Sequence, residues 1–325
     1  YGNTTGTGNT AIGTQALVAN TTGSYNTATG TFSLYTATTG SSNTAFGYSA
    51  AAALTTGVGN TSLGYLTLYK TTTGSYNTAT GWASLYNNTT GGYNIASGYR
   101  ALHNNTTGSY NGASGYTALY SNTTGDKNSA TGYSALYANT TGSYNMANGH
   151  LALANNKTGS YNMAMGFYAL NKNTGNSNMG LGTQALQYNT SGGNNSAIGT
   201  LALNRNTTGM NNVGIGFQSG YSNQTGSRNI FIGYQAGYSE TGSNKLYIDN
   251  SNTSSPLIYG DFATNALTVN GTLTATGGVT TTEILHTSGT KLLSLENGEV
   301  HLGPTSMIFT DSTISGNADI MSSTV

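Results

Sequence analysis

The chain has 325 residues, of which 6% are charged, against the roughly 25% that is usual in globular proteins. It contains 47 Gly and 24 Tyr, no Cys, and a formal net charge of zero. Many aromatic residues without net charge argue against disorder, and the absence of Cys excludes disulfide frameworks and thiolate metal sites. No run of 18 or more apolar residues occurs, so we expect no membrane insertion.

The charges are divided unevenly along the chain. Residues 1–239 hold seven Lys and Arg against one acid, Asp126, whereas residues 240–325 hold two Lys against eight acids. The seven cations lie far apart, and a nucleic-acid-binding surface needs them clustered. We therefore expect no nucleic-acid partner and interpret these cations as solvated surface residues.

An Asn recurs every 17 residues and defines a repeat, which we number from this Asn as position 0. The series runs through Asn9, Asn26, Asn43, Asn60, Asn77, Asn94, Asn111, Asn128, Asn145 and Asn162 and, after a deletion of one residue, Asn178, Asn195, Asn212 and Asn229. Gly follows every one at position +4 and precedes every one at position −3, and the consensus reads N-x-A-x-G-Y-x-A-L-Y-x-N-T-T-G-S-Y. A period of 17 is too short for helical-hairpin repeats.

This repeat predicts one coil of a β-solenoid, with short strands joined at corners that contain Gly. Each Gly file marks a place where the backbone takes positive φ or packs too closely for a side chain. An α-helical fold is not favoured, because Gly, Thr and Asn dominate every repeat and are poor helix formers. We predict an all-β fold, with a solenoid (β-roll) of about 14 coils over residues 1–245.

Alternation along the strand predicts which side chains face inward. Positions 0, +2 and +4, for example Asn111, Ala113 and Gly115, barely vary, and alternate residues of a strand share one face. We place Asn, Ala and Gly inside a narrow coil, with Leu of position +8 filling the remaining core. Stacked Asn side chains are expected to hydrogen-bond amide to amide as a ladder. The longest unbroken run of this ladder comprises Asn26, Asn43, Asn60, Asn77, Asn94, Asn111, Asn128, Asn145 and Asn162.

The C-terminal quarter has a different pattern. Residues 246–265 are interpreted as a capping segment, in which residues 255–262 form a strand and turn that close the solenoid. Residues 266–325 contain short Thr-, Val- and Leu-rich strands and a predicted hairpin over 291–302, with its turn at Asn297-Gly298. So short a region hardly buries a core alone, so we expect it to intertwine with copies of itself in an oligomerisation or shaft region. The chain opens within a repeat, since Tyr1 matches Tyr35, and we expect further residues upstream.

The repeat resembles sequences found in known fibre proteins. The string N-T-A-I-G-x-x-A-L-x-x-N-T-T-G at residues 9–23 resembles repeats of bacterial and phage tail-fibre-domain proteins. The exit S-N-K-L-Y-I-D-N at 243–250, followed by L-I-Y-G-D-F at 257–262, resembles the same family, and the N-x-A-I-G core is similar to the β-roll heads of trimeric autotransporter adhesins. The resemblance implies a homotrimeric extracellular fibre, on a cell or virion surface, that contacts other cells.

Residues typical of enzymes are sparse. Only Asp126 precedes Glu240 among the acids, whereas glycoside cleavage needs a pair. The four His, at positions 103, 150, 286 and 301, have no metal-ligand spacing, and no nucleophile elbow or P-loop occurs. We therefore expect a non-enzymatic protein with no catalytic residue, no metal and no cofactor.

Aromatic residues form three files. Position +5 holds Tyr48, Tyr65, Trp82, Tyr99, Tyr116 and Tyr133 in six successive repeats, and Tyr also recurs at positions +9 and −1. Two interpretations of the outward +5 file stay open: the rings stack and cover the coil or pack between subunits, or they form a strip that binds cell-surface polysaccharide. The predicted function is an extracellular fibre or adhesin rod that attaches to cell-surface glycans. The alternative is a self-assembling filament subunit, or homotrimer, without a specific ligand.

Two further patterns accompany the N-T-T-G turn. Sequons stand at Asn20, Asn88, Asn105, Asn122, Asn139, Asn206 and Asn223. Repetition of the turn explains them, but glycosylation at these positions would coat one edge of the rod with sugar. Thr pairs such as Thr123-Thr124 raise an ice-binding alternative. It is disfavoured, because adjacent residues of an extended backbone point to opposite sides and leave one outward Thr file.

Overall fold

The computed structural model describes residues 2–273, 283–285, 291–296 and 299–302. The chain divides into two units, Tyr1–Gly271 and Thr272–Val325. The described residues form strands and turns without any helix, so none of them belongs to a helix that could span a bilayer.

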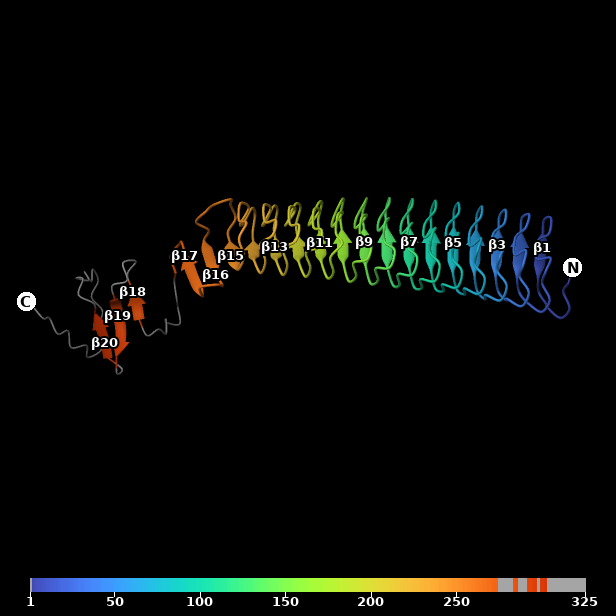
Figure 1. Cartoon of the computed structure of the whole chain (residues 1–325), viewed down its shortest axis with the longest axis horizontal. Coiled ribbons are helices and arrows are strands. Elements are labelled where there is room, and N and C mark those ends of the chain that lie inside the picture. The colour runs from blue at the N-terminus through green and yellow to red at the C-terminus, as the bar shows by residue number, and fades with distance from the viewer. Residues whose placement is uncertain (1, 274–282, 286–290, 297–298, 303–325) are drawn as a thin grey trace, which may run out of the picture. The chain divides into compact units, whose positions relative to one another are not determined.

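The first unit is a β-solenoid in which each repeat forms one coil with one short strand at positions +1 to +3 (Figure 1). The fourteen strands are β1 Thr10–Ile12, β2 Thr27–Thr29, β3 Thr44–Phe46, β4 Thr61–Leu63, β5 Thr78–Thr80, β6 Ile95–Ser97, β7 Gly112–Ser114, β8 Ser129–Thr131, β9 Met146–Asn148, β10 Met163–Met165, β11 Met179–Leu181, β12 Ser196–Ile198, β13 Val213–Ile215 and β14 Ile230–Ile232. Each pairs in parallel with its neighbours, residue for residue, so that Ala96 lies beside Ala113. The predicted all-β solenoid of about 14 coils with a 17-residue period is confirmed.

Three residue types fill the interior, as the alternation predicts for Asn and Ala. From β2 onward the central strand residue is buried, and Ala113, at 2%, is the most exposed Ala among them. The Asn of position 0 is buried from Asn26 onward, and Leu of position +8, such as Leu102, is fully buried. The core is therefore narrow and continuous along the coils.

The Gly of position +4 lies at a corner of the coil and not in the core, which corrects the predicted inward placement. Gly132 is half-buried and has φ +124°, in the left-handed region. A Cβ added there would lie 2.7 Å from the carbonyl oxygen of Gly149 in the next coil. Both reasons for the recurring Gly thus apply at this corner: the backbone has positive φ, and the backbone of the next coil is too close for a side chain.

Non-glycine residues also adopt positive φ, which the sequence did not predict. In one coil these are Tyr110 at φ 59°, Thr117 at φ 51° and Leu119 at φ 52°, and the same positions recur in the other coils. Left-handed backbone costs about 1–2 kcal/mol per non-Gly residue. The cost is offset by hydrogen bonds between coils, such as the 2.9 Å bond that the Leu119 N–H donates to the Ala135 carbonyl.

The deletion in the coil that starts at Asn162 falls in a turn. The N-T-T-G corner is there shortened to Asn173-Thr174-Gly175, so one Thr is missing. The N–H groups of Thr174 and Gly175 both donate to the Thr190 carbonyl, at 2.7 and 2.9 Å. Strands β10 and β11 therefore keep their register across the deletion.

The last coils are closed by a repacked core. Phe231 replaces Ala at position +2, and it is fully buried because Gly220 and Gly237 replace the usual Leu at position +8. Strand β15 (Lys245–Ile248) pairs in parallel with β14, and β16 (Ile258–Asp261) and β17 (Ala266–Val269) then pair antiparallel. The predicted closing strand and turn are confirmed. Because β17 belongs to this sheet, the first unit runs to Gly271, past the boundary expected after residue 265.

The second unit contains a three-stranded antiparallel sheet of β18 (Glu283–Leu285), β19 (Lys291–Glu296) and β20 (Glu299–Leu302). Strands β19 and β20 form the predicted hairpin, with Glu296 paired to Glu299. The residues of its turn, Asn297 and Gly298, lie outside the described part of the chain. So does most of the segment for which we expect intertwining between copies, together with His286.

Candidate functional site

The Asn of position 0 forms the predicted ladder along the core, with one bond that was not foreseen. In every coil from Asn26 to Asn229, the backbone N–H donates to the Oδ1 of the preceding ladder Asn, at 2.9–3.0 Å. Amide-to-amide bonds accompany it at several rungs, for example the 3.1 Å bond from Asn77 Nδ2 to Asn60 Oδ1. Nδ2 also donates to a Gly carbonyl, as Asn77 does to Gly91 at 2.9 Å.

A second Asn ladder runs along position +11. Asn122 Nδ2 donates to Asn105 Oδ1 at 2.7 Å, and Asn139 Nδ2 donates to Asn122 Oδ1 at 2.8 Å. Each Nδ2 also donates to the carbonyl of the Gly three residues later, as Asn122 does to Gly125 at 2.9 Å. The 17-residue recurrence of this Asn was visible in the sequence, where we interpreted it only as part of a turn.

The sequon asparagines belong to this second ladder and do not form an exposed edge. Each is at most 2% exposed, and the Nδ2 atom that would carry a glycan donates a hydrogen bond of 2.8–3.0 Å to a Gly carbonyl; the residues are Asn20, Asn88, Asn105, Asn122, Asn139, Asn206 and Asn223. A sugar-coated edge at these positions is therefore incompatible with the folded solenoid.

The Thr of the same turns divide between two sides, as expected. Thr123 Oγ1 donates to the Thr140 carbonyl of the next coil at 3.1 Å, whereas Thr124 is exposed. Of these two turn positions, only +13 places its Thr in solvent, so the turn pairs do not form a double file.

The +5 rings form one continuous stack on the surface. The six predicted residues, Tyr48, Tyr65, Trp82, Tyr99, Tyr116 and Tyr133, are 37–49% exposed, and the stack continues through His150 and Phe167. Successive centroids lie 4.9–5.8 Å apart with interplanar angles of 4–18°. The first of the two open interpretations, rings that stack on one another, describes this geometry.

The other two files also stack. At position +9 the rings of Tyr69, Tyr86, His103, Tyr120 and Tyr137 follow one another at 5.1–5.3 Å, all half-buried except the exposed Tyr137. At position −1, Lys127 interrupts the Tyr file, with its Nζ 4.9 Å from the Tyr144 ring centroid and donating to the Tyr144 hydroxyl at 2.9 Å. The stacking has a consequence for binding. Each ring covers much of its neighbour's face, so the files present mainly ring edges and phenol hydroxyls to solvent.

Most cations of the solenoid lie over these rings. The guanidinium of Arg100 is 4.9 Å from the Trp82 ring and 5.3 Å from the Tyr99 ring, and Lys70 lies 5.4 Å from the Tyr86 ring. These cation–π contacts refine the prediction of solvated cations. Burial, together with the Arg100 and Lys70 charges, lowers the pKa of His103, against the raising effect of its Nδ1 bond to the Ala83 carbonyl at 2.9 Å.

The outward face of the strands changes along the rod. Positions +1 and +3 are mostly Thr and Ser in β5, β7 and β8, whereas from β10 to β14 they are apolar except for Ser196 of β12. Met165, Ile198, Ile215 and Ile232 are 36–43% exposed. We call these four residues, with Leu181, the apolar strand face. No charged residue stands at position +1 or +3 of these strands.

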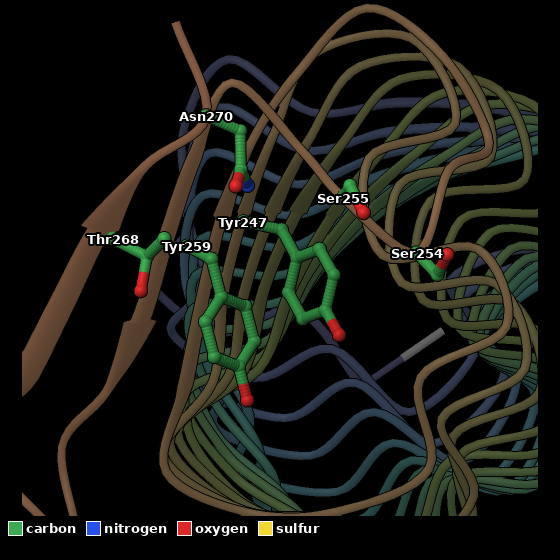
Figure 2. A pocket seen from close by; sticks show the side chains of 6 residues that line it. All are labelled: Tyr247, Ser254, Ser255, Tyr259, Thr268 and Asn270. Atoms are coloured by element: carbon green, nitrogen blue, oxygen red, sulfur yellow. The ribbon is translucent and has the colours of Figure 1, made fainter. Parts of the chain in front are cut away.

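The closed end of the solenoid carries a small pocket (Figure 2). It has a volume of about 270 Å³ and is lined by Tyr247, Tyr259, Ser254, Ser255, Thr268 and Asn270. The two rings meet edge to face at 5.2 Å, and the Tyr247 ring lies 5.9 Å from the buried Phe231. Phe231, Tyr247 and Tyr259 therefore close the end of the core, and the pocket lies beside the two tyrosine rings.

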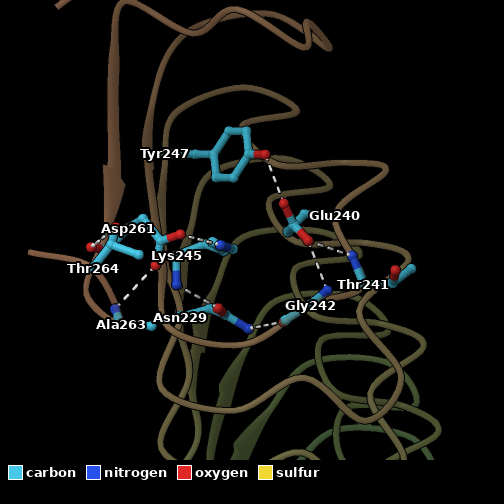
Figure 3. Close-up of polar contacts among 9 residues, drawn as sticks. All are labelled: Asn229, Glu240, Thr241, Gly242, Lys245, Tyr247, Asp261, Ala263 and Thr264. Atoms are coloured by element: carbon cyan, nitrogen blue, oxygen red, sulfur yellow. Dashed lines mark hydrogen bonds and ion pairs between the residues drawn. The ribbon is translucent and has the colours of Figure 1, made fainter. Parts of the chain in front are cut away.

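Charged residues take the next position after the last Asn of both files (Figure 3). Lys245 stands in place of the next core Asn; its N–H donates to Asn229 Oδ1 at 2.8 Å, and its Nζ pairs with Asp261 at 2.7 Å. Glu240 stands in place of the next Asn of the second ladder and accepts a 2.6 Å hydrogen bond from the Tyr247 hydroxyl. Burial, and then the Glu240 carboxylate, raise the pKa of Tyr247, while the bond from Lys245 lowers the pKa of Asp261.

The described residues contain no group of three or more His, Asp or Glu placed to hold a metal ion. Comparison with protein-family models, with curated proteins and with solved structures found no match.

Proposed function

We propose that the chain is a non-enzymatic rod of an extracellular fibre, on a cell or virion surface, that attaches to cell-surface polysaccharide through the +5 aromatic stack. The observation that carries this proposal is the stack of eight exposed rings along one side of a solenoid. In-register hydrogen bonds link every coil to the next, so the rings are held in fixed positions. Residues 1–239 carry one carboxylate, Asp126, which does not suit acid–base catalysis on this surface.

The stack favours an extended polymer that lies along the rod. Ring edges and hydroxyls repeat at about 5 Å, once for each coil, from Trp82 to Tyr133. Tyr and Trp combine a large apolar area with a polar tip, which suits sugars that carry both C–H and O–H groups. A regular row of weak contacts gives avidity to a polymer that a single sugar unit would not have.

A second function, self-association into a homotrimer or filament, is favoured by the apolar strand face. Exposed apolar patches on soluble proteins mark interaction sites, and this face carries Met165, Ile198, Ile215 and Ile232 without any charge. It lies on the strands, whereas the +5 rings follow the corner at position +4. Copies that associate through the strands would keep the ring stack accessible. Native mass measurement distinguishes a monomer, a trimer and a filament, and isolated short rods at high concentration would contradict the filament.

The glycan proposal is tested by a polysaccharide array together with a cell-attachment assay. The double variant Trp82→Ala, Tyr99→Ala removes two adjacent rings from the centre of the stack, and we expect about five- to 150-fold weaker binding, since a ring contact is worth about 0.5–1.5 kcal/mol. Tyr144→Ala, in the −1 file, is the matched control and should bind normally. Absence of any bound glycan, with unchanged cell attachment of the double variant, would rule the proposal out.

A further inference from the structure

The +5 and +9 files both lack a ring in the coils that start at Asn178 and Asn195, and the +9 file already lacks one in the two coils before, at Ala154 and Asn171. In the coils of Asn178 and Asn195, the residues at position +5 are Thr183 and Thr200, and those at position +9 are Gln187 and Asn204. Stacked rings resume only in the next coils, with Phe217 against Tyr234 at 5.4 Å and Tyr221 against Tyr238 at 5.0 Å. The interruption leaves a groove of about 440 Å³ on the side of the solenoid, within the range of small-molecule sites.

The floor of this groove is made of two buried amides. Gln187 is 9% exposed and Asn204 is 2% exposed, and both line the groove. Asn204 Nδ2 donates to the Gln184 carbonyl at 2.8 Å and to Gln187 Oε1 at 3.4 Å. Within the described residues, neither Gln187 Nε2 nor Asn204 Oδ1 has a hydrogen-bond partner of its own. The groove thus offers one free donor and one free acceptor, on two side chains that are otherwise mostly buried.

The walls carry two rings and a cation. Tyr188 is 40% exposed; Lys172 Nζ lies 4.6 Å from its centroid, and no described ring stacks on it. Arg205 lies over Tyr221 at 5.1 Å, and both residues line the groove. Unlike the rings of the continuous stacks, the Tyr188 ring has a face that no aromatic neighbour covers.

The charge at the groove is positive. Lys172 and Arg205 occupy position +10 of coils on either side of Tyr188. Neither has an acid in an adjacent coil, because Asp126 lies three coils before the coil of Lys172 and Glu240 lies two coils after the coil of Arg205. An anionic group on a ligand would meet the Arg205 guanidinium, which binds carboxylates through paired hydrogen bonds.

We propose that this groove binds an acidic oligosaccharide, one whose sugar units carry carboxylates. Arg205 would pair with a carboxylate, Gln187 and Asn204 would hydrogen-bond sugar hydroxyls, and the Tyr188 ring would lie against a sugar face. Planar amides, a guanidinium and a free Tyr face together suit a sugar better than an acidic peptide, which offers no apolar ring face. The site is separate from the +5 stack of the proposed function, and neither site requires the other.

The test is isothermal titration of the full chain with tetragalacturonate, with cellotetraose as the neutral probe and tetraglutamate as the acidic peptide. We expect saturable binding of tetragalacturonate alone. Arg205→Gln should weaken it about tenfold or more, and Gln187→Met, which keeps the side-chain length, about two- to tenfold. Arg228→Gln makes the same charge change outside the groove and should leave the affinity unchanged.

Several results would overturn the proposal. These are absence of tetragalacturonate binding, equal binding of tetraglutamate or cellotetraose, and equal weakening by Arg228→Gln. Unchanged affinity in both groove variants would do the same. The Trp82→Ala, Tyr99→Ala protein separates this site from the proposed +5 site, because it should bind tetragalacturonate normally even where its attachment to cells is lost.

Discussion

At the scale of the residue, asparagine holds the solenoid together by joining side chain to backbone between coils. Its Oδ1 takes the N–H of the next ladder Asn, as Asn145 Oδ1 does from Asn162 at 3.0 Å, and its Nδ2 satisfies a Gly carbonyl. The sequence predicted the ladder from spacing and parity. It did not predict that the constant bond is to the backbone, because spacing shows which residues stack but not which atoms meet.

Truncation of a ladder residue tests this arrangement. Asn145→Ala would leave the Asn162 N–H and the Gly159 carbonyl without these partners inside the core. We expect a loss of about 1–3 kcal/mol in unfolding free energy, since buried groups that lose a partner keep their desolvation cost. The measurement is urea denaturation together with amide hydrogen exchange, because coils of a repeat protein open partly independently.

Asn148→Ala is the matched control in the same coil. Asn148 stands at the outward +3 position of β9 and is exposed. Its loss should change stability by less than about 0.5 kcal/mol. Equal losses at the two positions would contradict the ladder.

Protonation of His103 gives a second prediction at this scale. Its ring is stacked between Tyr86 and Tyr120, and burial lowers its pKa below the usual value of about 6.5. The unfolded chain then binds more protons than the folded chain, so stability should fall as pH drops below about 6.5 toward the lowered pKa. His103→Tyr keeps the stack and should be less sensitive to acid over this window. Parallel stability curves for the two proteins between pH 7 and 5 would contradict the assignment.

At the scale of the element, the strand was predictable and the turn was not. Three-residue strands with one inward Ala follow from alternation, and their parity is confirmed from β2 onward. The turn from +5 to +10 uses left-handed backbone at residues such as Leu119, a conformation that Leu rarely adopts alone. The conformational preferences of the single residues therefore did not predict this left-handed backbone, because hydrogen bonds between coils determine it.

The second ladder was missed for a related reason. Asn122 and its counterparts stand in an N-T-T-G motif that is typical of a turn, and local chemistry suggested an exposed sequon. In the solenoid the same turn folds inward at position +11 and outward at position +13. Which side chains are buried at a corner depends on the backbone path of the turn. The inward–outward alternation of the strand does not predict that path.

The natural deletion in the coil of Asn162 predicts where the chain tolerates shortening. Removal of Thr124, at the exposed +13 position, should leave a folded solenoid with a stability loss of at most about 1–2 kcal/mol, because the coil then matches the corner at Thr174-Gly175. Circular dichroism and thermal unfolding measure the outcome.

Removal of Ser129, in β8, is the matched control. A shift by one residue turns the inward Ala130 outward and moves its outward neighbours into the core. We expect this protein to lose cooperative unfolding in that half of the solenoid. Equal effects of the two deletions would contradict the prediction that the turn tolerates the loss of one residue and the strand does not.

At the scale of the whole molecule, stability is the sum of contacts between neighbouring coils. Fourteen coils at about 4.8 Å each give a rod of roughly 65 Å. Such a rod needs an end, and the sequence indicated one through the closing strand and turn expected over residues 255–262. The exchange of Leu for Gly220 and Gly237 around Phe231 was not foreseen, because it couples residues from different coils.

The surface was predictable to a similar degree. The outward files and their ring content follow from the period, so the +5 residues were named correctly as exposed rings. Their mutual stacking follows from a strand spacing close to the stacking distance of aromatic rings. The groove at Gln187 and Asn204 was not predicted. The sequence shows that rings are missing at positions +5 and +9, but not that these two positions lie side by side on the surface.

The most direct test is nuclear magnetic resonance measurement of couplings across hydrogen bonds in the isotope-labelled chain. The backbone nitrogen of each ladder Asn should couple to the side-chain amide carbon of the Asn 17 residues earlier, and at Asn178 to that of Asn162, 16 residues earlier. Couplings from these nitrogens to backbone carbonyls instead, or from none of them to an Asn side chain, would contradict the stacked solenoid.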